Sequence, residues 1–292
     1  MATRRAIPVS PSSGPGTLYL VATPIGNLRD ITLRALDVLK AVSLVAAEDT
    51  RRTAKLLAHY GIRTRTLSFH SHNEAQRAPS VLERLRAGES VALVTDAGTP
   101  LVSDPGARLV RTALAAGVAV EPIPGASALL AALAMSGVEA DEFTFVGFPP
   151  SRSNSRIKWL RNLSAEPRPL ILFEAPHRIR RTLGDITDIF GDIEVSVCRE
   201  ITKLHEELVK GPISSVLRSL PEPKGEFTLV IQAPLAYSQA QTEMPSDNDI
   251  AEEFCRIAEI YPSRRSAIKY LAGKYGLKTS AVYLIVEGAK FK

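Results

Sequence analysis

The pair Glu48-Asp49 directly follows an apolar run, residues 44–47, that predicts a buried strand. Paired carboxylates at the end of a strand can shift each other's pKa values, so either residue is a candidate general base. The alternative is that Asp49 or Thr50 caps the following helix while Glu48 is solvated. Both interpretations stay open at the level of the sequence.

His70, His72 and Glu74 alternate at the end of another predicted strand, near residues 66–70. Alternate residues of a strand share one face, which raises the question of a metal site. The set lacks a clear fourth ligand and lies where the strand already turns. We therefore expect no metal here, and favour contact with a substrate or plain loop polarity.

Residues 95–106 form a glycine- and proline-rich turn between an apolar run and a helical pattern. Gly98 lets a ligand come close to the backbone, and Pro100 stiffens the turn. Asp104 is expected to cap the next helix, with Pro105 at its first position. Taken alone, the segment also fits an ordinary connection between a strand and a helix.

Four similar turns follow other predicted strands, and in a parallel sheet all five emerge at one edge. They carry little positive charge, which suits a neutral or zwitterionic small molecule better than a triphosphate. The presence of four similar turns at the same edge favours a ligand site at residues 95–106. No G-x-G-x-x-G follows the first strand, and the chain contains no G-x-x-x-x-G-K-[ST] or G-x-S-x-G motif. The turns are 24–27, 48–51, 70–74, 96–100 and 124–127.

Two segments are basic. Trp159 is flanked by Arg152, Arg156, Lys158 and Arg161, and His177-Arg178 follow nearby. In such patches the basic side chains bind phosphates and the aromatic ones stack on bases. A solvated helix face has the same composition. Residues 262–292 carry seven lysines or arginines and one acid, and predict two short helices joined by a glycine-containing turn. This pattern fits a helix-turn-helix or a simple docking pair of helices.

Strands and helices alternate along residues 17–136, which predicts an α/β domain with a largely parallel sheet. Residues 137–234 predict a second α/β domain with a more mixed sheet. Residues 1–16 are expected to be a flexible tail, 235–249 a linker and 250–292 a basic helical unit.

The composition is that of a globular protein, with 45% hydrophobic and 23% charged residues. A net charge of +5 is compatible with a polyanionic partner such as RNA. Two cysteines without a CxxC pair argue against a disulfide framework or a zinc site. Without a signal-peptide pattern or a membrane-spanning run, we expect a soluble cytoplasmic protein.

Taken together, the turns resemble those of the tetrapyrrole-methylase superfamily of S-adenosylmethionine-dependent enzymes, over nearly the whole chain. Within it, the motifs are similar to those of the branch that methylates small-subunit ribosomal RNA. They read Val-Ala-Thr-Pro-Ile-Gly-Asn-Leu (21–28), Glu-Asp-Thr-Arg (48–51), Phe-His-Ser-His-Asn-Glu (69–74), Asp-Ala-Gly-Thr-Pro-Leu (96–101) with Ser-Asp-Pro-Gly (103–106), Cys-Arg-Glu-Ile-Thr-Lys (198–203) and Lys-Gly-Glu-Phe (224–227).

The resemblance implies two domains with the methyl donor, S-adenosylmethionine, in the cleft between them, and a homodimer. It implies 2′-O-methylation of a cytidine ribose in the decoding region of small-subunit rRNA, free or in the assembled subunit. The tetrapyrrole-acting relatives carry Gly-Asp-Pro where this chain has Gly98-Thr99-Pro100, which argues against a porphyrin substrate. The alternatives are a tetrapyrrole C-methyltransferase and a non-catalytic RNA-binding assembly factor.

Carried over by motif, the resemblance implies the donor-binding positions Ile25, Gly98, Thr99, Pro100, Val102, Ser127, Ala128 and Phe173. The 2′-hydroxyl is a poor nucleophile until its proton leaves, so a base near the cleft would help. From their place at the cleft edge, the candidate catalytic residues are Glu48, Asp49, His72 and Glu74. From the two basic segments, the candidate RNA-binding residues are Arg152, Lys158, His177, Arg178, Lys269 and Lys274.

Overall fold

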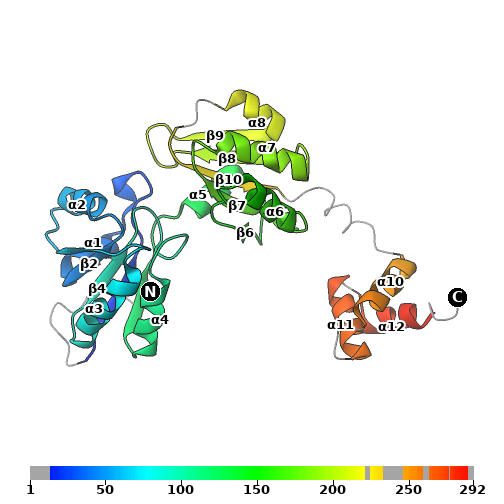
Figure 1. Ribbon diagram of the computed structural model, residues 1–292, viewed down its shortest axis with the longest axis horizontal. Coiled ribbons are helices and arrows are strands. Elements are labelled where there is room, and N and C mark those ends of the chain that lie inside the picture. Colours follow the sequence, from blue (N-terminus) through cyan, green and yellow to red (C-terminus); the bar gives the residue numbers. More distant parts are fainter. Residues whose placement is uncertain (1–13, 221–223, 233–245, 259–262, 276, 289–292) are drawn as a thin grey trace. The chain divides into compact units, whose positions relative to one another are not determined.

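The computed structural model describes residues 14–220, 224–232, 246–258, 263–275 and 277–288. Its first sheet, in which Figure 1 labels β2 and β4, has five parallel strands in the order β3-β2-β4-β1-β5. The strands are β1 (Thr17–Val21), β2 (Leu44–Ala47), β3 (Thr66–Ser68), β4 (Val91–Val94) and β5 (Ala119–Ile123). The predicted parallel sheet is confirmed.

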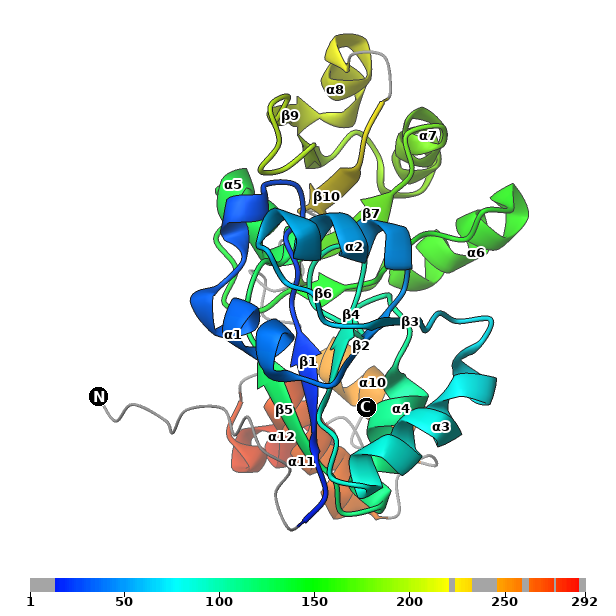
Figure 2. The ribbon, with the colours of Figure 1, turned by 90° about the vertical axis from the view of Figure 1, so that its left-hand side faces the viewer.

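Helices cover both faces of this sheet. One face packs on α1 (Leu33–Ala41) and α2 (Thr50–His59), and the other on α3 (Glu74–Arg86) and α4 (Ala107–Ala115) (Figure 2). Successive strand residues point to opposite faces, so β2 and β4 are apolar throughout and supply both cores. The core residues of these two strands are Val45, Ala47, Ala92 and Val94 toward α1 and α2, and Leu44, Ala46, Val91 and Leu93 toward α3 and α4.

The order of the strands places a crevice at the carboxyl edge of the sheet. β1 and β4 are neighbours, yet the helix after β1 lies on one face and the helix after β4 lies on the other. The chain therefore leaves two adjacent strands in opposite directions, which is the arrangement that opens a ligand site in doubly wound sheets.

The second sheet is mixed, as predicted. Its order is β6-β7-β10-β8-β9, with β6 and β7 parallel and every other pair antiparallel. The strands are β6 (Thr144–Phe145), β7 (Leu170–Glu174), β8 (Glu194–Arg199), β9 (Glu207–Pro212) and β10 (Phe227–Ile231). Helices α6 (Ser153–Leu163), α7 (Ile179–Phe190) and α8 (Ile213–Ser219) pack on one face.

Helix α5 (Ala128–Ser136) covers the other face of the second sheet, although it directly follows the last strand of the first sheet (Figure 1). Its Ala132 packs against Ile171, Cys198 and Val230. Small side chains let the helix lie close to the strands. The chain passes from one sheet to the other through α5, and the pocket described below lies beside its first turn.

Thr32 is the N-cap of α1, and its hydroxyl accepts a hydrogen bond from the amide of Ala35 at 3.1 Å. A short 3-10 turn, η1 (Leu28–Asp30), occupies the preceding residues. The predicted linker 235–249 is too long, because α10 begins at Asp247 with Ser246 as its cap. Residues 235–245, and residues 1–13 of the predicted tail, lie outside the described part.

Residues 233–292 form a compact unit of their own. Among its described residues, three helices pack around Ile250, Phe254, Leu271 and Val282. They are α10 (Asp247–Ile257), α11 (Arg264–Lys274) and α12 (Thr279–Gly288). In the described part of the chain, no helix combines the length and apolar character that crossing a membrane requires.

Candidate functional site

The turns after β1 and β4 are joined by their backbones at the crevice. The amide of Thr23 donates to the carbonyl of Gly98 at 2.9 Å, and the amide of Gly98 donates back at 3.0 Å. The Thr23 hydroxyl adds a bond to the carbonyl of Thr95 at 3.0 Å. Gly98 has a φ of +88°, a conformation that favours glycine. The pairing fixes both turns at the mouth of the sheet.

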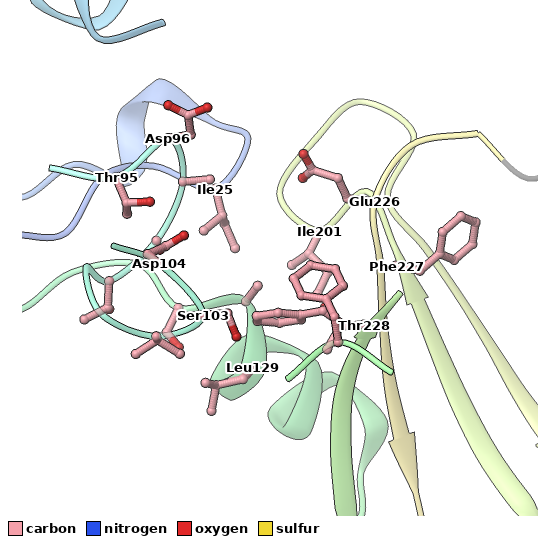
Figure 3. A pocket seen from close by; sticks show the side chains of 18 of the residues that line it. Ile25, Thr95, Asp96, Ser103, Asp104, Leu129, Ile201, Glu226, Phe227 and Thr228 are labelled. Carbon is pink, nitrogen blue, oxygen red and sulfur yellow. The ribbon is translucent and has the colours of Figure 1, made fainter. Parts of the chain in front are cut away.

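A pocket of about 410 Å³ lies where these turns face the second sheet (Figure 3). Small-molecule sites in proteins span roughly 300–1,000 Å³. Asp96 and Asp104 lie on the side of the first sheet, and Ile201, Glu226 and Thr228 lie opposite. The described lining residues are Ile25, Glu48, Arg52, Thr95–Thr99, Val102–Asp104, Ser127–Leu129, Phe148, Phe173–Pro176, Ile201 and Gly225–Thr228.

One part of the pocket is apolar and aromatic. The rings of Phe148 and Phe173 lie 5.4 Å apart at their centroids, and Phe145 supports Phe173 from behind at 5.0 Å. Ile25 and Ile201 add aliphatic surface. Such a surface suits a flat aromatic ring or an aliphatic chain.

The polar part of the pocket is acidic. Five carboxylates and one cation, Arg52, occur among its described lining residues. Three of the carboxylates have cationic partners: Asp96 faces Arg52, Glu174 binds Arg178, and Glu226 binds Lys203. The other two, Glu48 and Asp104, have no such partner among the described residues. A ligand that brings a positive charge would balance them.

Glu48 is held by the turn after β4. Its Oε2 accepts from the hydroxyl of Thr95 at 3.0 Å and from the amide of Asp96 at 3.4 Å. The amide of Asp49 in turn donates to Oδ1 of Asp96 at 2.9 Å. These bonds tie the strand ends of β2 and β4 together.

Burial raises the pKa of Asp104 to about 6, against a hydrogen bond with Thr95 that lowers it. The negative charges of Glu48 and Asp96 raise it further. Burial also raises the pKa of Asp96. A carboxyl group that titrates near neutral pH inside a cleft is typical of a functional site.

The backbone around Asp104 is strained. Leu101 and Ser103 have φ values of +76° and +65°, which non-glycine residues rarely adopt. Such conformations persist where the surrounding structure holds them, and they cluster at ligand sites. Here they place Val102 and Ser103 in the wall of the pocket.

A loop after β8 connects the two halves across the pocket. The amide of Asn27 donates to the hydroxyl of Thr202 at 3.1 Å. A Cβ atom on Gly26 would lie 2.4 Å from Cγ of Lys203, so only glycine fits there. Thr202 itself has a φ of +68°. The first turn is thus held against the second sheet.

The predicted donor-binding residues fall almost entirely in the pocket. Seven of the eight line it, and Pro100 is buried behind the turn instead. The seven are Ile25, Gly98, Thr99, Val102, Ser127, Ala128 and Phe173. The backbone amide of Gly98 is already bonded to Thr23, so its contribution is one of shape.

The predicted catalytic residues are not brought together. Glu48 lines the pocket, whereas Asp49 caps α2 through a bond from the amide of Arg51 at 2.8 Å. His72 is exposed and contacts the ring of His70. None of these residues, nor Glu74, belongs to a metal-binding group: the described residues contain no cluster of three or more potential ligands.

Asp104 and Glu74 are placed differently from their sequence-based assignments. The predicted cap at Asp104 is wrong: α4 begins after Gly106, which has no side chain to offer, and Asp104 lines the pocket. Oε1 of Glu74 accepts from the amides of Arg108 and Leu109 at 3.0 and 3.3 Å, and so caps α4 from another helix. A negative charge at a helix N-terminus is favourable whichever segment supplies it.

The predicted RNA-binding residues of the second half differ in exposure. Arg152, Lys158 and His177 are exposed. Arg178 is engaged, with an ion pair to Glu174 at 2.6 Å and a bond to the carbonyl of Pro149. Two other members of the basic segment are also structural, since Arg156 is fully buried and Trp159 packs on the core of the second sheet.

In the C-terminal unit, Lys269 is exposed on α11. Lys274 ends the same helix, and its side chain lies outside the described part.

Sequence reasoning missed Asp104, Phe148, Glu226 and Thr228 as pocket residues. The Ser-Asp-Pro-Gly segment pointed to Asp104 as a site residue. We assigned Asp104 to a helix cap instead, because Asp before Pro is also typical of a cap.

Comparison with known proteins assigns this architecture to a known family and fold. Residues 17–217 match the family model described as Tetrapyrrole (Corrin/Porphyrin) Methylases. Among solved structures, diphthine synthase superposes with a TM-score of 0.61 at 15% identity, covering 74% of this chain and 90% of that one. Cobalt precorrin-4 methyltransferase superposes with a TM-score of 0.55 at 21% identity, covering 73% and 94%. The two sheets and the pocket therefore define the tetrapyrrole-methylase fold.

Relatives with similar sequences identify a narrower family than the fold does. The ribosomal RNA small subunit methyltransferase I of Escherichia coli O157:H7 is 41% identical over 279 residues, which cover 94% of this chain and 96% of the relative. The protein of that name from Xylella fastidiosa is 48% identical over 225 residues, covering 75% and 82%. This chain belongs to the ribosomal RNA small subunit methyltransferase I family, within the tetrapyrrole methylases.

Proposed function

We propose that this protein transfers the methyl group of S-adenosylmethionine to the 2′-hydroxyl of a cytidine ribose in the decoding region of small-subunit ribosomal RNA. The observation that carries the proposal is the pocket at the switch point of the first sheet. Its aromatic wall suits an adenine ring, and the uncompensated carboxylates Glu48 and Asp104 suit a cation. The names of its relatives supply the substrate class.

When bound, S-adenosylmethionine supplies a methyl group on a positively charged sulfur, which is a strong leaving group. The protein then has to hold the acceptor oxygen in line with that methyl group, and orientation gives most of the acceleration. We assign removal of the hydroxyl proton to Asp104, because a base titrating near neutral pH fits this task. Glu48, held by Thr95 and Asp96, balances the positive charge.

The remaining assignments follow from this proposal. Ile25, Gly98, Thr99, Val102, Ser127, Ala128 and Phe173 form the donor site. Arg152, Lys158, His177 and the C-terminal helices contact rRNA, and Arg178 orders the loop that presents Arg152. We further propose a homodimer that acts in the cytoplasm, where its substrate is assembled. Light scattering of the purified protein tests the oligomeric state.

Binding of the donor is tested by calorimetric titration with S-adenosylmethionine. Replacing Ala128 by Trp fills the pocket and should abolish measurable binding. The matched control is Leu130→Trp, two residues along α5, where the leucine is 54% exposed and outside the lining. Equal affinity for both variants and the wild type would place the donor elsewhere.

The acceptor is tested with labelled donor and rRNA in which the target cytidine carries either a 2′-hydroxyl or a 2′-hydrogen. Transfer to the ribose oxygen requires the first RNA to be methylated and the second to stay unlabelled. Labelling of both would show methylation of a base instead. Transfer to a uroporphyrinogen-type tetrapyrrole in place of RNA would support the alternative enzyme class.

A further inference from the structure

A second cavity, of about 320 Å³, adjoins the donor pocket. Some residues line only this second cavity. They belong to the turn after β1 and to helix α2, and Lys203 joins them. In-line methyl transfer requires the acceptor to approach the methyl group from a space that meets the donor site. Two cavities with a common wall meet this requirement. The residues of that wall are Ile25, Arg52, Thr95, Asp96, Ala97 and Glu226.

The two cavities differ in charge. Among described lining residues, the second has three cations, Arg52, Lys55 and Lys203, and two acids, Asp96 and Glu226. The donor pocket has one cation and five acids. The second cavity therefore suits an anion, whereas the donor pocket suits a cation.

The three cations differ in how far they are engaged. Lys203 is held between Glu200 and Glu226, with N–O distances of 2.8 and 3.0 Å. Arg52 lies 3.6 Å from Asp96, and its side chain remains 61% exposed. Lys55 is exposed and forms no ion pair with any residue in the described ranges. Arg52 and Lys55 are three residues apart on α2 and so share one face of that helix.

We propose that this second cavity is the acceptor subsite and that Lys55 and Arg52 bind a backbone phosphate next to the target ribose. The inference deepens the proposed function and rests on it. A lysine and an arginine on one helix face bind a phosphodiester by charge and N–H donation. The ribose beside that phosphate then reaches the donor across Asp96 and Ile25, while Lys203 holds the loop that closes the cavity.

The test uses the full-length protein, labelled donor and small ribosomal subunits that lack the modification. Replacing Lys55 by Ala should raise KM for the subunit about tenfold and lower the slope of log KM against log salt by about one, because one phosphate contact is lost. Affinity for S-adenosylmethionine should stay unchanged. Lys55→Arg should restore KM, and Lys40→Ala, an exposed lysine on α1 outside both cavities, should behave as wild type.

Unchanged KM and salt slope in Lys55→Ala would overturn the subsite. So would a loss of donor affinity, since the cavity would then hold the carboxylate of the donor itself. Equilibrium binding of a labelled rRNA fragment without donor separates this proposal from the proposed reaction. If wild-type protein transfers no methyl group but Lys55→Ala still weakens RNA binding with a lower salt slope, the reaction fails and the subsite stands.

Discussion

The carboxyl group of Asp104 changes its charge close to physiological pH, because burial and two neighbouring carboxylates raise its pKa to about 6. At pH 7.5 it is largely ionised and able to accept a proton. At pH 5 it is largely neutral. The acidity of the medium therefore controls both the proposed base and the charge that faces the donor.

Replacing Asp104 by Asn removes this titration. In the wild type, kcat/KM for RNA should rise with pH through about 6 and then level off, because kcat/KM reports the base of the free enzyme. In Asp104→Asn it should be reduced at least about a hundredfold and lose that rise. A variant with a normal profile would show that proton removal occurs elsewhere.

The same substitution changes stability in a pH-dependent way. The folded-state pKa lies above the ordinary value of 3.8, so the ionised carboxylate destabilises the fold. Its stability contribution is fully present below about pH 4 and is lost as the pH rises through about 6. Above pH 7, Asp104→Asn should be more stable by about 1–2 kcal/mol, after allowance for partial solvent exposure. Urea unfolding at pH 4 and pH 8 measures the difference, which should vanish at pH 4.

At the scale of elements, Arg156 joins α6, α7 and the loop before α6. Its guanidinium binds Asp185 at 2.6 Å and donates to the carbonyls of Pro150 and Ser151 at 3.3 Å each. The side chain is fully buried. Arg152, at the N-cap of α6, is positioned by this loop.

Arg156→Ala should therefore destabilise the protein by about 3 kcal/mol, because the partly buried carboxylate of Asp185 loses the cation that balances it. Lys158→Ala, on the exposed side of the same helix, should change stability by less than about 0.5 kcal/mol. Thermal and urea unfolding of both variants provide the comparison. Equal stability would mean that solvent replaces the arginine at no cost.

The strands could be predicted from the sequence because apolar runs such as 44–47 and 91–94 are buried on both faces. The turns at their ends followed from that order, and the family resemblance supplied seven of the residues that line the pocket. The packing of α5 on the second sheet could not be predicted, since an apolar helix fits either core. Arg156 also escaped prediction, because a buried and an exposed arginine look alike in a sequence.

At the scale of the whole molecule, the C-terminal unit has a core of its own, and its helix α11 exposes basic side chains. Arg264 is engaged there, bound to Glu287 and lying over the ring of Phe254 at 5.6 Å. Arg265 and Lys269 are exposed on the same helix, α11. We propose that these two side chains contact RNA.

Arg265→Glu combined with Lys269→Glu should weaken binding of small-subunit rRNA at least about tenfold, because two favourable phosphate contacts become repulsive. Donor affinity should not change, since the described residues that line the proposed donor pocket all lie between residues 25 and 228. Filter binding and calorimetry measure the two affinities. Removal of residues 233–292 should give the same pattern, and unchanged RNA affinity in both proteins would assign the unit another role.

The backbone pairing of Thr23 with Gly98 joins two segments that lie far apart in the chain. Neither turn can change its length or path without disturbing the hydrogen bonds of the other. Insertions in one of these segments during divergence should therefore be accompanied by compensating changes in the second. The two turns should therefore vary together among relatives, although they lie far apart in the chain.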